Sequence, residues 1–331
     1  MANHRAFRPL PLLSNPHLQT VLGNLLSWTR DRHAATMRTV PLPDGDALAI
    51  HDSAPASWQS GGPIAVLVHG LAGCHRSGYM RRIANRLTVN GVRVVRLDLR
   101  GAGAGMKLAR KFYNAACSPD IRTVIEVLHR EHPSSPIVLL GFSLGGNIVL
   151  RLAAEAAAQP VAGLVAVGAV APPIDLVRCS ELISRQPFYD RFYVRQLIGQ
   201  VQEHGRHFPD LPGAVFPAGA TLRDFDEVYT APRWQFASAL DYYTRASAHP
   251  LIPSICLPCL IVTSRDDPFV ALAPFEEATP GPGVTIDITP HGGHLGFLGG
   301  DGAGGIRWAE TRVISWALGQ LDDCQRTLRP S

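Results

Sequence analysis

A single serine lies where the chain predicts a sharp turn between a strand and a helix. The apolar run at residues 137–142 breaks at Gly141-Phe142-Ser143-Leu144-Gly145, and the residues after it favour a helix. A side chain at the apex of such a turn needs strained backbone angles and close contact between strand and helix, which the flanking glycines permit. The pattern therefore predicts that Ser143 is exposed as a nucleophile.

A serine hydroxyl is a weak nucleophile, so it needs a base within hydrogen-bond reach and an acid that orients the base. In one recurring arrangement the acid and the base follow later strands of the same sheet, in the order serine, acid, histidine. Segment 264–270, Ser-Arg-Asp-Asp-Pro-Phe-Val, follows an apolar run at 259–263. Segment 291–297, His-Gly-Gly-His-Leu-Gly-Phe, follows another run at 284–289. The two segments supply candidates for both partners.

Each segment offers two candidates. For the acid we favour Asp267 over Asp266, because Asp267 stands three places after a small residue and directly before Pro-Phe-Val, the pattern of a common acid loop. For the base we favour His294, which stands between glycines and an apolar stretch, where a tight loop can direct the ring. His291 follows a proline at the end of the expected strand, and we expect it to be structural.

Acyl transfer passes through an oxyanion, which two preorganised backbone N–H groups must stabilise. Leu144, directly after the serine, is expected to supply the first donor. The second is expected from segment 68–73, Val-His-Gly-Leu-Ala-Gly, in which Leu71 is the natural donor. The alternative for this segment is a glycine turn that binds no ligand.

The candidate serine, acid and histidine can meet only if one sheet holds them at the same edge. The sequence contains alternating strand and helix patterns that predict such a sheet. The first thirty residues are proline-rich and irregular, and the apolar segment 21–28 among them is uninformative alone. Residues 36–51, around Pro-Asp-Gly-Asp, predict a hairpin. The later expected strands are 64–68, 92–98, 137–142, 161–170, 259–263 and 284–289, and the expected helices are 80–87, 119–132, 144–157 and 306–321. This alternation predicts an α/β fold with a mostly parallel central sheet and flanking helices.

The alternation stops between residues 172 and 255. This stretch is rich in aromatic and charged residues, and no strand-like run occurs until residue 259. The pattern favours a helical insertion over one end of the sheet. We therefore expect a core of residues 1–171 and 256–331, with a helical cap at 172–255.

The composition excludes several classes of protein. A hydrophobic share of 46% with 18% charged residues is typical of a soluble globular protein, and no apolar run reaches the roughly eighteen residues of a membrane span. The N-terminus lacks the apolar core of a signal peptide, which favours a cytoplasmic location. The net charge is +4, but the basic residues are scattered, so nucleic-acid binding is not expected.

No cofactor or metal site is expected. The six cysteines are too few for a disulfide framework, and we expect reduced thiols. Cys256 and Cys259 have the spacing of a redox motif but lack a second ligand pair for zinc, so buried structural thiols are favoured. Segment 98–105, Asp-Leu-Arg-Gly-Ala-Gly-Ala-Gly, departs from the glycine spacing of a dinucleotide-binding loop. No acidic residue ends a second strand about twenty residues later, so a dinucleotide site is not expected here.

Together, His69-Gly70, the segment 98–103, the Gly-Phe-Ser-Leu-Gly turn, Asp267 and His294 resemble the α/β-hydrolase superfamily. More narrowly, the chain is similar to its YheT-like branch, the AB hydrolase 4 family of predicted esterases and lipases. The segments that carry this narrower similarity are 15–20, 69–73, 225–232, 241–247, 266–269 and 292–297. The loop after Arg100-Gly101 departs from the Cys/Ser-Gly-Glu-type sequence usual in the branch. Some eukaryotic relatives carry a membrane anchor, which we do not expect here.

The resemblance implies a serine hydrolase that cleaves carboxylic esters through an acyl-enzyme. Ser143 would attack, His294 would carry the proton and Asp267 would orient the histidine. The aromatic residues of the insertion favour apolar acyl chains over peptides, so the expected partner is a small-molecule ester or lipid of short to medium chain length. Two alternatives stay open, an acyltransferase that uses the same residues and a non-catalytic protein that binds a ligand on this scaffold.

Overall fold

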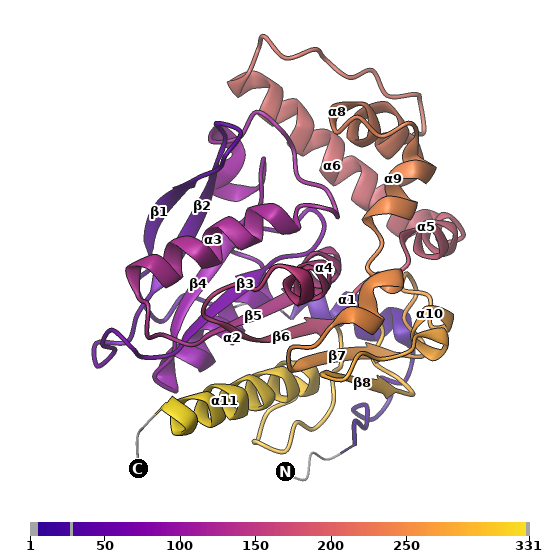
Figure 1. The fold of residues 1–331 in the computed structure, drawn as a ribbon. Helices are drawn as coiled ribbons and strands as arrows, with labels where there is room; N and C mark the ends of the chain where they lie inside the picture. Colours follow the sequence, from indigo (N-terminus) through magenta and orange to yellow (C-terminus); the bar gives the residue numbers. More distant parts are fainter. Residues whose placement is uncertain (1–5, 27–28, 329–331) are drawn as a thin grey trace.

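An eight-stranded sheet runs through the middle of the protein in the strand order β1-β2-β4-β3-β5-β6-β7-β8 (Figure 1). The computed structural model describes residues 6–26 and 29–328. The strands are β1 (Thr36–Pro41), β2 (Ala47–Ser53), β3 (Ile64–Val68), β4 (Arg93–Asp98), β5 (Ile137–Phe142), β6 (Leu164–Val170), β7 (Cys259–Ser264) and β8 (Val284–Thr289). The predicted hairpin is confirmed, because β1 and β2 pair antiparallel. Strand β2 also runs antiparallel to β4, and all the other neighbours are parallel.

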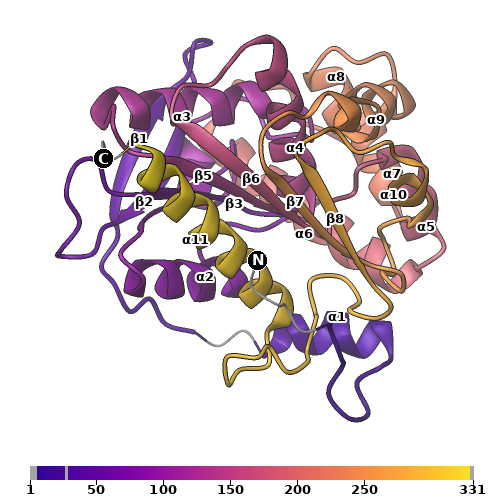
Figure 2. The same cartoon turned by 60° about the horizontal axis from the view of Figure 1, so that its bottom comes forward.

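Helices cover both faces of the sheet. Helices α3 (Ser118–Glu131) and α4 (Leu144–Ala158) cover one face, and α2 (Gly78–Val89) and α11 (Trp308–Leu328) cover the other (Figures 1 and 2). Strand β3 contacts both layers, because successive side chains of a strand point to opposite faces. Ile64 packs in the cluster of α3 and α4, whereas Ala65 packs in the cluster of α2 and α11. This double burial explains why the central strands are continuous apolar runs.

The N-terminal segment differs from the irregular chain that its sequence suggested. Residues Pro16–Leu25 form helix α1, and the side chain of Asn15 caps it by accepting hydrogen bonds from the N–H groups of His17 and Leu18. Pro16 occupies the first turn, where a missing N–H costs nothing. The apolar segment 21–28 thus lies partly in α1, and its residues 27 and 28 are outside the described part.

Two other expectations need correction at the level of single residues. The expected strand 161–170 begins only at Leu164, because Gly163 adopts a φ of +81° in the turn before it. Cys256 is exposed in the loop before β7, so only Cys259 of this pair is a buried thiol. Burial raises the pKa of Cys259 to about 12, and the thiol is inert at neutral pH.

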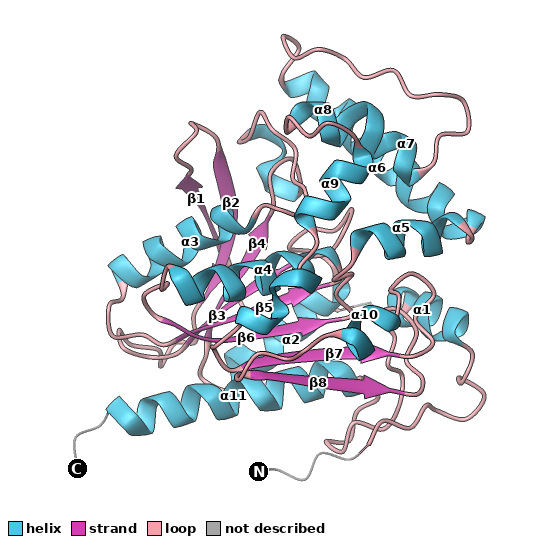
Figure 3. Ribbon diagram, turned by 45° about the vertical axis from the view of Figure 1, so that its right-hand side comes forward, coloured by secondary structure: helices cyan, strands magenta, loops and turns pink. Residues whose placement is uncertain are grey.

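The chain between β6 and β7 forms helices and no strand, and every residue from 172 to 258 is described. The helices are α5 (Leu176–Ser184), α6 (Pro187–His207), α7 (Leu222–Phe225), α8 (Ala231–Arg233) and α9 (Ala239–Ala246). Figure 3 shows this group of helices beside the sheet, near the short helix α10 (Ala273–Glu277). The division into a core and a cap at residues 172 and 255 stays a prediction. No helix in the described ranges combines the length and apolar character needed to cross a bilayer.

Candidate active site

Ser143 lies at the apex of the turn between β5 and α4, with a φ of +51° and a ψ of −124°. This backbone region is costly for a residue with a side chain, and it persists only where the surroundings enforce it. The two flanking glycines allow the close contacts that do so. A Cβ on Gly141 would lie 2.3 Å from the carbonyl oxygen of Gly145, and one on Gly145 would lie 2.4 Å from that of His69. The turn therefore holds the half-buried hydroxyl at the end of β5.

The structure brings the other two candidates to this hydroxyl. His294 follows β8, and its Nε2 lies 2.9 Å from Oγ of Ser143. Asp267 follows β7, and its Oδ2 lies 2.8 Å from Nδ1 of His294. The Asp267 side chain is fully buried, and its Oδ1 accepts hydrogen bonds from the N–H groups of Phe269 and Val270. Since a buried carboxylate only accepts, Nδ1 of His294 carries the proton, and Nε2 is left to accept from the serine.

The neighbouring acid and histidine form a separate pair. Oδ2 of Asp266 lies 3.2 Å from Nδ1 of His291, and its Oδ1 accepts a hydrogen bond from the N–H of Gly293 at 2.9 Å. Neither residue forms a hydrogen bond to Ser143, and the side chain of His291 is 45% exposed. Asp266 therefore holds the loop that carries His294.

Helix α1 supports the same loop from the other side. The N–H of His294 donates to Oγ1 of Thr20 at 2.9 Å. The fully buried side chain of Gln19 donates to the carbonyl oxygens of Leu13 and Leu298 and accepts from the N–H of Leu298 at 2.6 Å. The segment 15–20 thus connects the N-terminal chain to the histidine loop, a role that its sequence alone did not reveal.

Two backbone segments lie beside the serine. Leu144 is the first residue of α4, so its N–H has no partner within the helix. On the other side, the segment 69–73 passes directly against the serine, because a Cβ on Gly70 would lie 2.9 Å from Cβ of Ser143. Leu71 follows Gly70 and lines the same cavities as Ser143.

Buried side chains fix the segment that carries Leu71. The N–H groups on either side of Leu71 donate to tyrosine hydroxyls, Gly70 to Tyr79 at 2.9 Å and Ala72 to Tyr113 at 2.7 Å. The N–H of Leu71 lies between these two hydrogen-bonded N–H groups. Burial raises the pKa of Tyr79 to about 12, so its hydroxyl stays protonated at neutral pH. Sequence reasoning missed both tyrosines because their hydroxyls reach this segment only in the folded chain.

An apolar cavity of about 820 Å³, counted with its open mouth, begins at the serine. This size is in the range of small-molecule sites. Its walls come from the core and from the helices between β6 and β7, and they include Ile183, Leu197, Phe225, Tyr242, Phe269 and Val270. The polar groups among them include Asp226, which accepts a hydrogen bond from the hydroxyl of Tyr243 at 2.7 Å. Burial raises the pKa of Asp226 to about 6.

A second cavity, of about 1000 Å³ with its open mouth, lies between α1 and α6. Its walls are more polar and include Asn24, Ser77, Arg82 and Gln196. Leu71, Ser143, Tyr193 and His294 line both cavities. The serine hydroxyl therefore faces an apolar space on one side and a polar space on the other.

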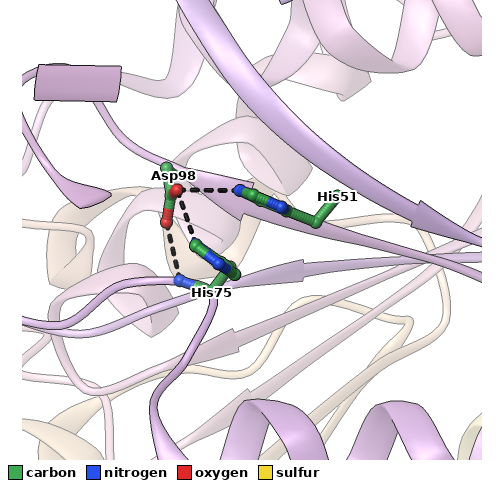
Figure 4. Close-up of side chains that lie close together, drawn as sticks. All are labelled: His51, His75 and Asp98. Atoms are coloured by element: carbon green, nitrogen blue, oxygen red, sulfur yellow. Dashed lines mark hydrogen bonds and ion pairs between the residues drawn. The ribbon is translucent and has the colours of Figure 1, made fainter. Parts of the chain in front are cut away.

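One cluster away from the serine has metal-ligand residue types. His51, His75 and Asp98 are buried, and their ligand atoms lie within 4.8 Å of one another (Figure 4). Oδ2 of Asp98 accepts from Nε2 of His51 at 3.0 Å and from Nδ1 of His75 at 2.7 Å. Although burial raises the pKa of Asp98, the hydrogen bonds from the two histidines hold it well below its ordinary value.

The geometry of this cluster fits a hydrogen-bond network better than a metal site. The rings of His51 and His75 are stacked, with centroids 3.4 Å apart and planes inclined by 14°. One nitrogen of each ring is already hydrogen-bonded to Oδ2 of Asp98. Asp98 also accepts from the N–H groups of His75 and Ala104. The carboxylate thus connects β2 and β4 to the loops that follow β3 and β4.

Comparisons with known proteins agree with this fold. The family described as alpha/beta hydrolase fold matches residues 63–301. YheT of Escherichia coli is 31% identical over 96% of this chain and 94% of its own length. A monoacylglycerol lipase of Saccharomyces cerevisiae is 27% identical over 74% of this chain and 57% of its own length. The solved structure of the esterase Pf2001 of Pyrococcus furiosus has a TM-score of 0.55 and 16% identity, and the match covers 90% of this chain and 96% of that one. The chain belongs to the α/β-hydrolase fold family.

Proposed function

We propose that this protein is a serine hydrolase that cleaves carboxylic esters through an acyl-enzyme. One observation carries the proposal: the continuous chain of hydrogen bonds from Ser143 Oγ through His294 to Asp267, at 2.9 and 2.8 Å, beside an apolar cavity. The names of relatives support the same class, since YheT is named as an esterase and the yeast relative as a monoacylglycerol lipase.

The first half of the reaction forms the acyl-enzyme. Nε2 of His294 takes the proton of the Ser143 hydroxyl as Oγ attacks the ester carbonyl carbon. The carbonyl oxygen becomes an oxyanion, which the N–H groups of Leu71 and Leu144 stabilise. His294 then gives its proton to the departing alcohol, and the acyl group stays on Oγ. Asp267 holds the ring in the required tautomer and stabilises its positive charge.

The second half releases the acid. Water enters from the side that the alcohol has left, and His294 takes one of its protons as the water oxygen attacks the acyl carbon. The second tetrahedral oxyanion occupies the same two N–H donors. Its collapse releases the carboxylic acid and returns the proton from His294 to Ser143.

The two cavities suggest how the substrate lies. The apolar cavity accepts the acyl chain, because its aliphatic and aromatic walls offer dispersion contacts and few hydrogen bonds. The polar cavity accepts the alcohol, whose hydroxyl groups can bind Asn24, Ser77 or Gln196. An ester with a short to medium acyl chain and a polar alcohol, such as a monoglyceride, fits this division.

A series of p-nitrophenyl and glyceryl esters of increasing acyl length tests the proposal. We expect kcat/KM to rise with acyl length until the apolar cavity is filled and then to fall. The variant Ser143→Ala should retain the fold and lose turnover of every ester. Turnover by this variant at the wild-type rate, or no turnover of any ester by the wild type, would reject the proposal. Added glycerol separates hydrolysis from transfer, because an acyltransferase would make more glyceride than free acid.

A further inference from the structure

Exposed apolar side chains are concentrated on two neighbouring helices. Twelve large hydrophobic residues are exposed in the described part of the chain, and five of them lie on α1, at its C-terminal end or on α6. These five are Leu18, Leu25, Leu26, Phe188 and Phe192, and Phe188 is 72% exposed. Solvent-facing phenylalanines at consecutive turns of one helix gain nothing from water, so they indicate a surface that binds an apolar partner.

Unpaired positive charge lies among these side chains. Arg191 and Arg195 are exposed on α6, one turn apart and interleaved with the phenylalanines. Neither arginine forms an ion pair with any described residue. The acidic residue of this part of α6, Asp190, is buried and accepts a hydrogen bond from the N–H of Leu222. Helix α1 has no acidic residue. The surface therefore combines exposed apolar groups with net positive charge.

The two helices are in contact, so their exposed residues form one continuous surface. The ring of His17 on α1 stacks on Tyr189 of α6, with centroids 5.7 Å apart, and its Nδ1 lies 3.1 Å from the tyrosine hydroxyl. Farther along, the polar cavity lies between the same helices and reaches the surface at the exposed residues Asn24 and Gln196. The opening that leads to Ser143 is thus bordered by this surface.

We propose that the surface of Leu18, Leu25, Leu26, Phe188, Phe192, Arg191 and Arg195, named here the rim surface, docks the protein on the headgroup region of an anionic lipid membrane. Leucine and phenylalanine enter the boundary between headgroups and acyl chains, and arginine binds lipid phosphates. This combination favours a lipid surface over a protein partner, because positive charge alternates with aromatic groups along a single helix face. Docking places the opening of the polar cavity against the layer that contains lipid esters.

The inference extends the proposed function, but its test does not depend on catalysis. The full-length Ser143→Ala protein is mixed with sucrose-loaded vesicles of phosphatidylcholine alone or of phosphatidylcholine with phosphatidylglycerol, and the bound fraction is measured after sedimentation. We expect binding to the anionic vesicles that weakens as salt is added. Failure of the proposed function would appear separately, as an absence of ester turnover in the wild type.

Two variants identify the contributions of the rim surface. Replacing both arginines, Arg191→Gln with Arg195→Gln, should weaken binding about 25-fold, because each basic residue near an anionic surface contributes about fivefold. Phe188→Gln should weaken it about tenfold through lost apolar burial. Matched controls lie elsewhere: Val215→Gln removes a side chain that is 90% exposed, and Arg130→Gln removes an exposed charge on α3, and neither should change binding.

Three results would overturn the inference. The first is equal binding of the rim variants, the controls and the parent protein. The second is no binding to either kind of vesicle. The third is a concentration-dependent dimer, measured by light scattering, that becomes monomeric in Phe188→Gln without any vesicle binding, since the rim surface would then join two copies of this chain. Turnover of a short water-soluble ester by Phe188→Gln with Ser143 intact should equal that of the wild type, which shows that the variant is folded.

Discussion

Replacing Asp267 by asparagine distinguishes the two neighbouring acids. The amide oxygen of the new side chain can still accept from the N–H groups of Phe269 and Val270, as Oδ1 does at 2.9 and 3.0 Å. Its NH₂ group then faces Nδ1 of His294, where Oδ2 now lies at 2.8 Å. Two donors would oppose each other, so His294 must move its proton to Nε2. That nitrogen can then no longer accept the proton of Ser143.

The expected loss in Asp267→Asn is therefore one of chemistry and not of folding. A wrong histidine tautomer lowers kcat about 10⁴-fold, which corresponds to about 5.5 kcal/mol of transition-state stabilisation. KM should change little, because Asp267 does not line either cavity. The assay is steady-state turnover of a p-nitrophenyl ester with purified protein, with thermal unfolding measured in parallel.

Asp266→Asn is the matched control, because it makes the same chemical change one residue away. An asparagine there still accepts from the N–H of Gly293, so the loop that carries His294 keeps this contact. We expect kcat within about tenfold of the wild type, since only indirect positioning is changed. If Asp267→Asn retains wild-type kcat while Asp266→Asn loses it, the assignment of the acid is refuted.

Three further predictions concern the parts of the fold that support the site. Gln19→Ala leaves the buried N–H of Leu298 without its acceptor, whereas the carbonyl oxygen of Leu298 still accepts from the N–H of Leu10. We therefore expect a loss of about 1 to 3 kcal/mol in the free energy of unfolding and a lower kcat, measured by urea unfolding and ester turnover. An unchanged protein would show that α1 does not support the histidine loop. Gly141→Ala places a Cβ 2.3 Å from a backbone oxygen, so it should lower the free energy of unfolding by about 3 kcal/mol or more and abolish activity. Gly199→Ala on α6 meets open space and should raise the free energy of unfolding slightly. Equal effects of the two variants in urea unfolding would contradict this prediction. The native protein binds the proton of Asp226 more tightly than the unfolded chain does, because burial raises the pKa of this carboxyl from 3.8 to about 6. Protonated Asp226 therefore stabilises the native state fully below pH 3.8, and this contribution is lost as the pH rises through about 6. The unfolding free energy of the wild type should therefore fall relative to that of Asp226→Asn by about 3 kcal/mol across this range, and parallel pH profiles of the two proteins would refute the raised pKa.

The sequence predicts those parts of the structure that depend on local pattern. The buried strands β3 and β5 are recognisable because both of their faces are covered, and the turn at Ser143 is recognisable because its close contacts need glycine. Asp267 and His294 could be expected to meet because each directly follows a strand of one parallel sheet. These features need only a short stretch of chain and the rule that parallel strands end at the same edge.

Other features depend on contacts between distant segments, and sequence reasoning could not find them. Helix α1 has no strong apolar pattern, since its inner face is formed by Gln19 and Thr20, which bond to the histidine loop about 270 residues later. The hydroxyls of Tyr79 and Tyr113 meet the segment of Leu71 only in the folded chain. Capping by Asn15 before a proline was a usable signal for α1.

Labelling by a fluorophosphonate tests most directly the central claim that Ser143 is an activated nucleophile. The wild-type protein is treated with the probe, digested and analysed by peptide mass spectrometry, beside Ser143→Ala and heat-unfolded protein. We predict one phosphonylated site, at Ser143, in the folded wild type and none in either control. Absence of the adduct from Ser143 in folded, monodisperse protein, or an adduct on another serine of equal intensity in Ser143→Ala, would contradict the account.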